Sequence, residues 1–168
     1  MFVADGPETA GRFARWLRRV AAVRGRAAAG VPGAPAGQPA PDGPAAAEHR
    51  LPSPLHLAYL GDAVWELHVR TQLVTGREQK LADIHRQAVE QVRAAAQAGR
   101  LRRIEAELTE AEREMVRRGR NASPQGPRAA EASDYRFSTG FECLLGYLYW
   151  TGQVERLAEL LERMSGRE

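Results

Sequence analysis

Cysteine is almost absent from this sequence: Cys143 is the only one among 168 residues. A single cysteine excludes a disulfide within the chain and zinc sites built from several cysteines, and it favours a reducing compartment. No apolar run approaches the roughly 18 to 20 residues of a membrane-spanning helix, and the first residues lack the basic start and apolar stretch of a signal peptide. We therefore expect a cytoplasmic protein with no membrane association.

Lysine and histidine are also scarce. Lys80 is the only lysine, the other 23 basic residues are arginines, and the four histidines show no metal-ligand spacing such as His-Glu-x-x-His. Residues 1–50 carry seven arginines against four acidic residues, whereas residues 51–168 carry 17 basic and 17 acidic residues. Because the larger part is neutral overall, any affinity for nucleic acid must come from a local basic patch.

Composition divides the chain into three parts. Residues 1–26 form a basic extension with an amphipathic helix pattern, which suits weak packing on its own domain, a membrane surface or RNA. Residues 27–50 are a linker, since 18 of the 21 residues from 27 to 47 are Ala, Gly or Pro. Residues 51–168 contain the periodic apolar pattern of a folded domain.

The pattern in this domain is helical throughout. It predicts helices over residues 53–74, 80–98, 101–104, 109–118, 139–150 and 154–164. Gly99 is predicted to end the second helix, and residues 119–136, which include two prolines, are predicted to form a long loop. No alternating apolar and polar run indicates a strand, so we expect an all-α domain.

Asp62 is a lone carboxylate in an otherwise apolar helix. A charge there is costly to remove from water unless it is paired or binds a metal. It would be either a structural acid paired with an arginine such as Arg136, or a ligand of Mg²⁺ or Mn²⁺, which prefer carboxylate oxygens. Glu66, one turn later, can face the same side or pair with Arg70. The preceding Gly61 costs about 1 kcal/mol relative to alanine in a helix, which indicates close approach to another helix or to a second subunit.

Glu142 is a second lone carboxylate, at the start of the apolar stretch 141–150. Thr139 and Glu142 fit a capping box, which would make Glu142 a helix-start residue. Ser138 would serve equally well as the cap, which leaves Glu142 free. Two such acids, 80 residues apart, suggest one shared site for a divalent cation.

Arginines gather between the two acids. The candidate RNA contacts in this stretch, which contains no acid between residues 117 and 128, are Arg117, Arg118, Arg120, Asn121 and Arg128. The forked guanidinium group suits phosphate oxygens, although a merely solvated loop would have the same composition. Lys80 and His85 add candidate RNA contacts near the start of the second predicted helix.

These residues resemble a known family. The stretch LAYLGDAVWE at residues 57–66 resembles the signature helix of the ribonuclease III catalytic domain. The stretches RRGRN at 117–121 and YRFSTGFECLLGYL at 135–148 narrow the resemblance to the Mini-III branch, which lacks the usual double-stranded-RNA-binding domain. The resemblance covers residues 52–164 and leaves out the extension.

The resemblance implies a homodimeric, Mg²⁺-dependent endoribonuclease of double-stranded RNA, with Mn²⁺ as an alternative cation. It implies maturation of the large-subunit (23S) ribosomal RNA precursor, with 5′-phosphate and 3′-hydroxyl ends, and makes a ribosomal protein of the precursor particle a further candidate partner. Asp62 and Glu142 match the family's catalytic, metal-binding acids, and Gly61 suits close contact in the dimer. Larger ribonuclease III enzymes have two further acids, where this chain has Ala58 and Thr139.

Two other functions fit parts of the sequence. An all-α nucleotide pyrophosphohydrolase would bind Mg²⁺ through Glu-x-x-Glu acids, a spacing found at Glu107 and Glu110. A non-catalytic RNA-binding helical scaffold would keep the arginines without needing Asp62 and Glu142 together. Mg²⁺-dependent cleavage of duplex RNA, with single-stranded RNA and nucleoside triphosphates as controls, separates the three functions.

Overall fold

The computed structural model describes residues 51–75, 79–123 and 129–165, together with the isolated residues 15 and 18. The described helices are α3 (Pro54–Thr75), α4 (Leu81–Val92), α5 (Ala94–Ile104), the 3-10 turn η1 (Glu105–Glu107), α6 (Glu110–Ala122), α7 (Ala129–Trp150) and α8 (Val154–Ser165). None of these residues forms a strand, which confirms the all-α prediction. No helix among them has the length and apolar character needed to cross a membrane.

The predicted linker and nearly all of the predicted extension lie outside the described residues. Of the extension, the structure describes Arg15 and Arg18, which are helical and exposed. A guanidinium nitrogen of Arg18 lies 3.6 Å from a carboxylate oxygen of Glu155 on α8. The division of the chain at residues 26 and 50 stays a prediction.

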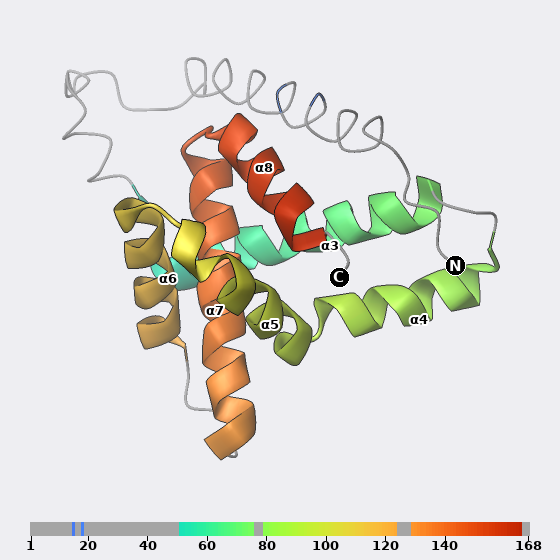
Figure 1. Ribbon diagram of the computed structural model, residues 1–168, viewed down its shortest axis with the longest axis horizontal. Helices are drawn as coiled ribbons and strands as arrows, with labels where there is room; N and C mark the ends of the chain where they lie inside the picture. The colour runs from blue at the N-terminus through green and yellow to red at the C-terminus, as the bar shows by residue number, and fades with distance from the viewer. Residues whose placement is uncertain (1–14, 16–17, 19–50, 76–78, 124–128, 166–168) are drawn as a thin grey trace, which may run out of the picture.

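Helix α7 runs through the middle of the described domain, and the other helices are arranged around it (Figure 1). Helix α3 crosses it, α5 and α6 pack along it, and α8 covers its end. Trp65 of α3 meets Phe141 of α7 edge to face, with ring centroids 5.2 Å apart, and both side chains are fully buried. The core around this pair is completed by Leu101, Leu144, Leu145, Leu148, Leu157 and Leu160.

The crossing of α3 and α7 is a contact of two backbones. A Cβ atom built on Gly61 would lie 1.8 Å from the carbonyl oxygen of Glu142, and one built on Gly146 would lie 1.9 Å from the carbonyl oxygen of Leu57. Only glycine fits at these two positions. The close approach predicted for Gly61 is therefore to another helix, α7 of the same chain, and the assignment of Gly61 to a dimer interface stays a prediction.

The predicted helix over residues 80–98 is two helices. The backbone of Arg93 is extended, with φ −64° and ψ 149°, and separates α4 from α5. Gly99 does not end a helix, since it lies inside α5. Neither proline nor glycine marks the break, and the apolar periodicity continues across it, so a periodicity argument alone merges the two helices.

The predicted long loop over residues 119–136 is mostly helical. Helix α6 continues to Ala122, α7 begins at Ala129, and only residues 124–128 of this stretch lie outside the described part of the chain. Gly119 packs against α7, where a Cβ would lie 2.6 Å from the Cβ of Cys143. Gly119 is thus a close-packing residue inside a helix, where the local rule treated it as a helix stop.

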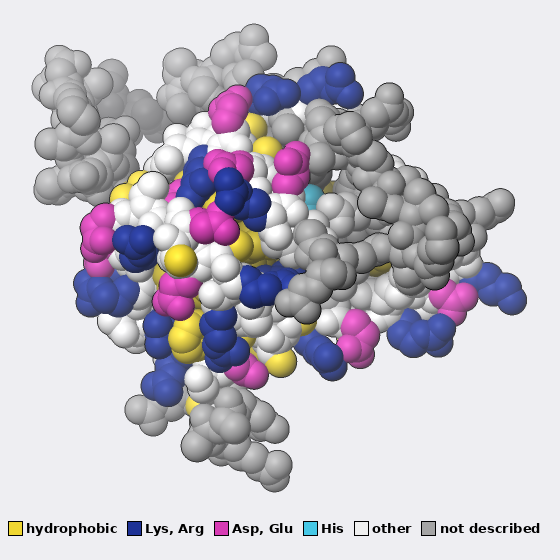
Figure 2. Space-filling view, in the orientation of Figure 1, with side chains coloured by type: hydrophobic (Ala, Val, Ile, Leu, Met, Phe, Trp, Pro, Cys, Tyr) yellow, Lys and Arg dark blue, Asp and Glu magenta, His cyan; other side chains and the backbone are white. Residues whose placement is uncertain are grey.

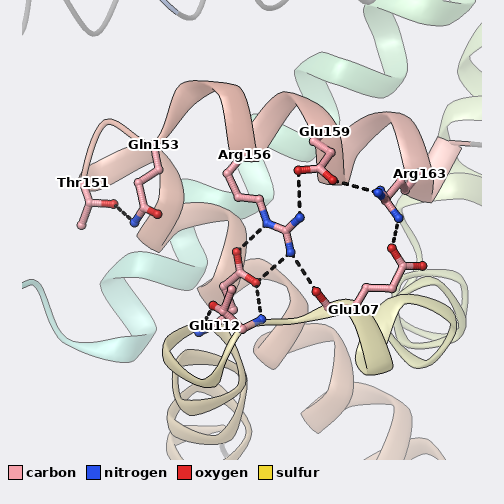
Figure 3. A network of polar contacts seen from close by, with 8 residues as sticks. Glu107, Glu112, Thr151, Gln153, Arg156, Glu159 and Arg163 are labelled. Carbon is pink, nitrogen blue, oxygen red and sulfur yellow. Dashed lines mark hydrogen bonds and ion pairs between the residues drawn. The ribbon is translucent and has the colours of Figure 1, made fainter.

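The start of α6 is tied to α8 by an ion-pair network (Figure 3). Glu112, which is 3% exposed, closes a capping box with Thr109. Its carboxylate also accepts from Nε and Nη2 of Arg156, at 2.8 and 3.0 Å. These hydrogen bonds, chiefly those from Arg156, hold the pKa of Glu112 below its ordinary range. Arg156 also donates to the carbonyl of Glu107 and to the carboxylate of Glu159, so one guanidinium connects η1, α6 and α8.

Replacing Gly61 with alanine is expected to lower the free energy of unfolding by about 3 kcal/mol or more, because the new Cβ forces two contacting backbones apart. Gly99→Ala is the matched control. Gly99 also lies inside a helix, but nothing lies within 4 Å of a Cβ built there, so alanine should stabilise the chain by about 1 kcal/mol. Urea unfolding measures both changes. A Gly61→Ala protein as stable as wild type would show that the two backbones are not in contact.

Candidate metal centre

Asp62 and Glu142 come together beside the crossing of α3 and α7. Asp62 follows Gly61 directly, and the carbonyl of Glu142 is the group that Gly61 contacts. Burial raises the pKa of Glu142 to about 7, and the negative charge of Asp62 contributes to the rise. Burial also raises the pKa of Asp62, followed by the charge of Glu66, while Arg70 opposes the rise. The repulsion between the two acids mainly raises the pKa of Glu142, the more deeply buried of the two.

Glu142 does not cap a helix. Helix α7 begins at Ala129, so Ser138, Thr139 and Glu142 lie well inside it. The hydroxyls of Ser138 and Thr139 donate to the carbonyl of Tyr135, at 2.9 and 3.0 Å, as expected within a helix. The capping-box interpretation is therefore wrong, and Glu142 is free for another role.

Neither acid is neutralised by an arginine. Among the described side chains, neither Asp62 nor Glu142 makes an ion pair, so the alternative that pairs Asp62 with Arg136 is also wrong. Glu66 does pair with Arg70, with 2.7 Å between Oε2 and Nη2, as the i,i+4 spacing predicted. Two partly buried acids without a cationic partner are an unfavourable arrangement in the isolated chain.

Gln97 of α5 is a third polar group at this place, and the sequence interpretation missed it. Its side chain is 1% exposed, and neither its amide nitrogen nor its amide oxygen has a hydrogen-bond partner. The amide approaches Glu142 and opposes the rise in its pKa, although no hydrogen bond of good geometry joins the two. The available signal was its register: Gln97 occupies a core-facing position of α5 with Leu101 and Ile104.

These groups fit a hard divalent cation. Mg²⁺ and Mn²⁺ prefer oxygen ligands, and a cation removes the repulsion that raises the pKa of Glu142. Within the described residues no group of three or more His, Cys, Asp or Glu side chains is placed to hold a metal. The protein therefore offers Asp62 and Glu142, with the amide of Gln97 beside them, and leaves the remaining positions to ligands such as water or phosphate.

The predicted RNA contacts lie on two separate helices. Arg117, Arg118, Arg120 and Asn121 are on α6 and not in a loop, while Lys80 and His85 are exposed at α4, on the other side of α7 (Figure 1). Arg128 lies outside the described residues. Figure 2 shows basic and acidic side chains intermixed on this face, without one continuous basic patch.

The α6 arginines differ in their surroundings. Nε and Nη2 of Arg117 each donate to a carboxylate oxygen of Glu114 at 2.7 Å. Arg118 is exposed. The guanidinium carbon of Arg120 lies 3.9 Å from the ring centroid of Phe137, and that of Arg102 lies 4.5 Å from it. Arg120 therefore has a packing role in addition to any contact with RNA.

Glu142→Gln is expected to raise the free energy of unfolding at pH 8 by up to about 3 kcal/mol in the presence of EDTA, and to leave it unchanged at pH 4. The sign follows from the pKa. The folded value of about 7 exceeds the ordinary 4.5, so the folded state holds the proton more tightly and the wild type loses stability as the pH rises between these values. A variant less stable than wild type at pH 8 in urea unfolding would contradict this origin of the shift.

His68 contributes a pH dependence of stability opposite to that of Glu142, and the two contributions must be separated. Burial, and then the charge of Arg100, lower the pKa of His68 from 6.5 to about 4. The unfolded state therefore binds the proton more tightly, and stability falls as the pH decreases between these values. This contribution is shared by wild type and Glu142→Gln, so the difference between the two proteins isolates Glu142.

Known proteins of one family are similar to this chain. The ribonuclease III domain family matches residues 55–153. The chain is 50% identical over 110 residues to Mini-ribonuclease 3 of Symbiobacterium thermophilum, covering 65% of this chain and 85% of that protein. It is 48% identical over 111 residues to Mini-ribonuclease 3 of a Thermoanaerobacter species, covering 66% and 78% of the two chains.

The fold is also found in a solved structure. A crystal structure of a protein from Fusobacterium nucleatum superposes with a TM-score of 0.62 at 25% identity, covering 68% of this chain and 93% of that one. The family match spans more than half of the chain and includes both Asp62 and Glu142. The chain therefore belongs to the ribonuclease III domain family, with Mini-ribonuclease 3 proteins among its relatives, and is an endoribonuclease.

Proposed function

We propose that the chain cleaves double-stranded RNA as a homodimer, with Asp62 and Glu142 holding Mg²⁺, or Mn²⁺ in its place. The observation that carries the proposal is the meeting of two partly buried carboxylates from separate helices, neither of which makes an ion pair with another described residue. The chemistry supplied by a bound cation is polarisation of a phosphate oxygen and a lower pKa for a coordinated water. The resemblance to the Mini-III branch makes a 5′-phosphate and a 3′-hydroxyl the product ends that we propose.

The protein's own residues supply binding and orientation. Asp62 and Glu142 fix the cation, and the partly buried position of Glu142 keeps competing water from much of its surface. Arg117 and Arg118 on α6 are exposed and suited to phosphates of the RNA backbone, which proteins contact when they recognise duplex RNA by shape. Lys80, His85, Asn121 and Arg128 are further candidates for such contacts.

A homodimer is supported by an exposed apolar stripe on α3. Leu55, Tyr59, Leu67 and Val74 are all exposed large hydrophobic side chains, and their spacing places them on one side of the helix. Asp62 is one turn after Tyr59. A two-fold dimer through this stripe would place both pairs of acids near the subunit boundary, one for each strand of a duplex.

The precursor of 23S ribosomal RNA is the substrate we propose, on the resemblance to the Mini-III branch, with a ribosomal protein of the precursor particle as a further partner. The other two functions are less well supported. Glu107 and Glu110, which a pyrophosphohydrolase would need, pair with Arg163 and Arg113. An RNA-binding scaffold gives no reason for Asp62 and Glu142 to meet.

Asp62→Asn is expected to reduce Mg²⁺-dependent cleavage of duplex RNA at least about 100-fold while leaving the fold intact, because asparagine keeps the shape and loses the charge that holds the cation. Glu66→Gln is the control: it lies one turn away on the same helix, but its partner is Arg70. It should keep turnover close to wild type. Asp62→Asn with wild-type turnover would remove this residue from the site.

Tyr59→Arg is expected to weaken the dimer about 30-fold, which corresponds to about 2 kcal/mol, by placing a charge in the apolar interface. Leu81→Arg on α4 is closely matched, since Tyr59 is 80% and Leu81 79% exposed, and it should leave association unchanged. Sedimentation velocity over a dilution series measures both. If both variants weaken the dimer equally, or if neither weakens it, the interface lies elsewhere.

Replacing Arg117 and Arg118 with alanine is expected to flatten the dependence of log affinity on log salt by about one for each lost phosphate contact. Arg163→Ala on α8 removes one positive charge from a residue paired with Glu107 and Glu159, and should not change the slope. Binding is measured in EDTA so that no cleavage occurs. An unchanged slope in the double variant means that α6 does not touch RNA.

A further inference from the structure

Gln97 is a buried side chain near the two acids, and its amide makes no hydrogen bond of good geometry within the part of the chain that the structure describes. It belongs to α5, which packs along α7, and it is 1% exposed. Neither its amide nitrogen nor its amide oxygen makes a hydrogen bond of good geometry with the described residues, although the amide lies close enough to Glu142 to lower the pKa of that acid. Other glutamines of the described domain are paired: Gln91 accepts from Arg100, and Gln87 donates to Gln79.

An unpaired buried amide is unfavourable. Leaving a buried donor or acceptor without a hydrogen bond costs about 1–3 kcal/mol, and native proteins rarely retain such groups without a reason. An apolar residue of similar size would fill the same position of α5 without this cost, beside Ala98 and Leu101. The amide is therefore best explained by a partner that is present only in the working state of the site.

We propose that Gln97 is a positioning residue of the metal centre: its amide N–H donates to the carboxylate of Glu142 when the cation is bound, and its amide oxygen accepts from a water molecule of the cation's hydration shell. The inference rests on the proposed cation site of Asp62 and Glu142. Glu142 is the acid of the site that the amide of Gln97 approaches, and it comes from helix α7, against which α5 packs. By fixing the orientation of this carboxylate, Gln97 would reduce the conformational freedom lost on binding.

Gln97→Leu is the test variant, and Gln97→Met, which keeps an unbranched side chain, is the second if leucine does not fit. Two quantities are measured: the free energy of unfolding in EDTA, and the dissociation constant for Mn²⁺ by isothermal titration calorimetry without RNA. The proposal expects a protein at least as stable as wild type in EDTA, with the affinity for Mn²⁺ reduced about 10- to 100-fold. A purely structural residue would instead lose stability and keep its affinity for Mn²⁺.

Gln91→Leu is the matched control. Gln91 lies on the neighbouring helix α4, and its amide oxygen accepts from Nη2 of Arg100 at 3.4 Å. Its replacement should reduce stability in EDTA, because Arg100 loses an acceptor, and should leave Mn²⁺ binding unchanged.

The failure of this proposal is distinguishable from the failure of the proposed function. Mn²⁺ binding that is lost in Asp62→Asn but unchanged in both Gln97 variants overturns the role of Gln97 alone. Mn²⁺ binding that is absent from wild type, or that Asp62→Asn leaves unchanged, overturns the metal centre and the role of Gln97 with it.

Discussion

The contact between the backbones of α3 and α7 is the constraint on which the site depends. Gly61 and Gly146 each face a carbonyl of the opposite helix, so neither helix can move closer or slide without a clash. Two glycines inside helices cost about 1 kcal/mol each in helix propensity. The close crossing brings Asp62 of α3 and Glu142 of α7 together, although they are 80 residues apart in the sequence. The site is therefore a property of the crossing, and neither helix contains it alone.

The candidate site contrasts with the electrostatics of the remaining domain. Elsewhere, acids at partly buried positions have partners: Glu112 accepts from Arg156, and Glu66 pairs with Arg70. At the crossing, burial raises the pKa values of two carboxylates that make no ion pair among the described residues, and the amide beside them is unpaired. These unfavourable groups are confined to one place, and the stability of the apolar core in the remaining domain offsets their cost. Local instability of this kind is expected where a ligand supplies the missing interactions.

The sequence was sufficient for the helical class, for most of the helices and for both acids, because these depend on apolar periodicity and on a charge that stands out against it. The errors occurred where a local rule competed with a tertiary contact. Gly119 matched a helix stop but packs against Cys143, and Thr139 matched a helix cap but lies within α7. Gln97 was missed because a glutamine in an alanine-rich helix carries no charge that stands out, and its core-facing register with Leu101 and Ile104 does not by itself indicate chemistry.

Larger ribonuclease III enzymes have two further acids, and the residues at these positions here, Ala58 and Thr139, cannot take over the role of a carboxylate. Ala58 is buried in the core with Leu57, and the hydroxyl of Thr139 is committed to the carbonyl of Tyr135. In the proposed site the protein would supply two negative charges, which would balance one divalent cation and leave much of its coordination shell to water and phosphate. A phosphate of the RNA would then be both substrate and ligand. Cation and RNA should consequently strengthen each other's binding by the same factor, as thermodynamic linkage requires of two ligands that share contacts.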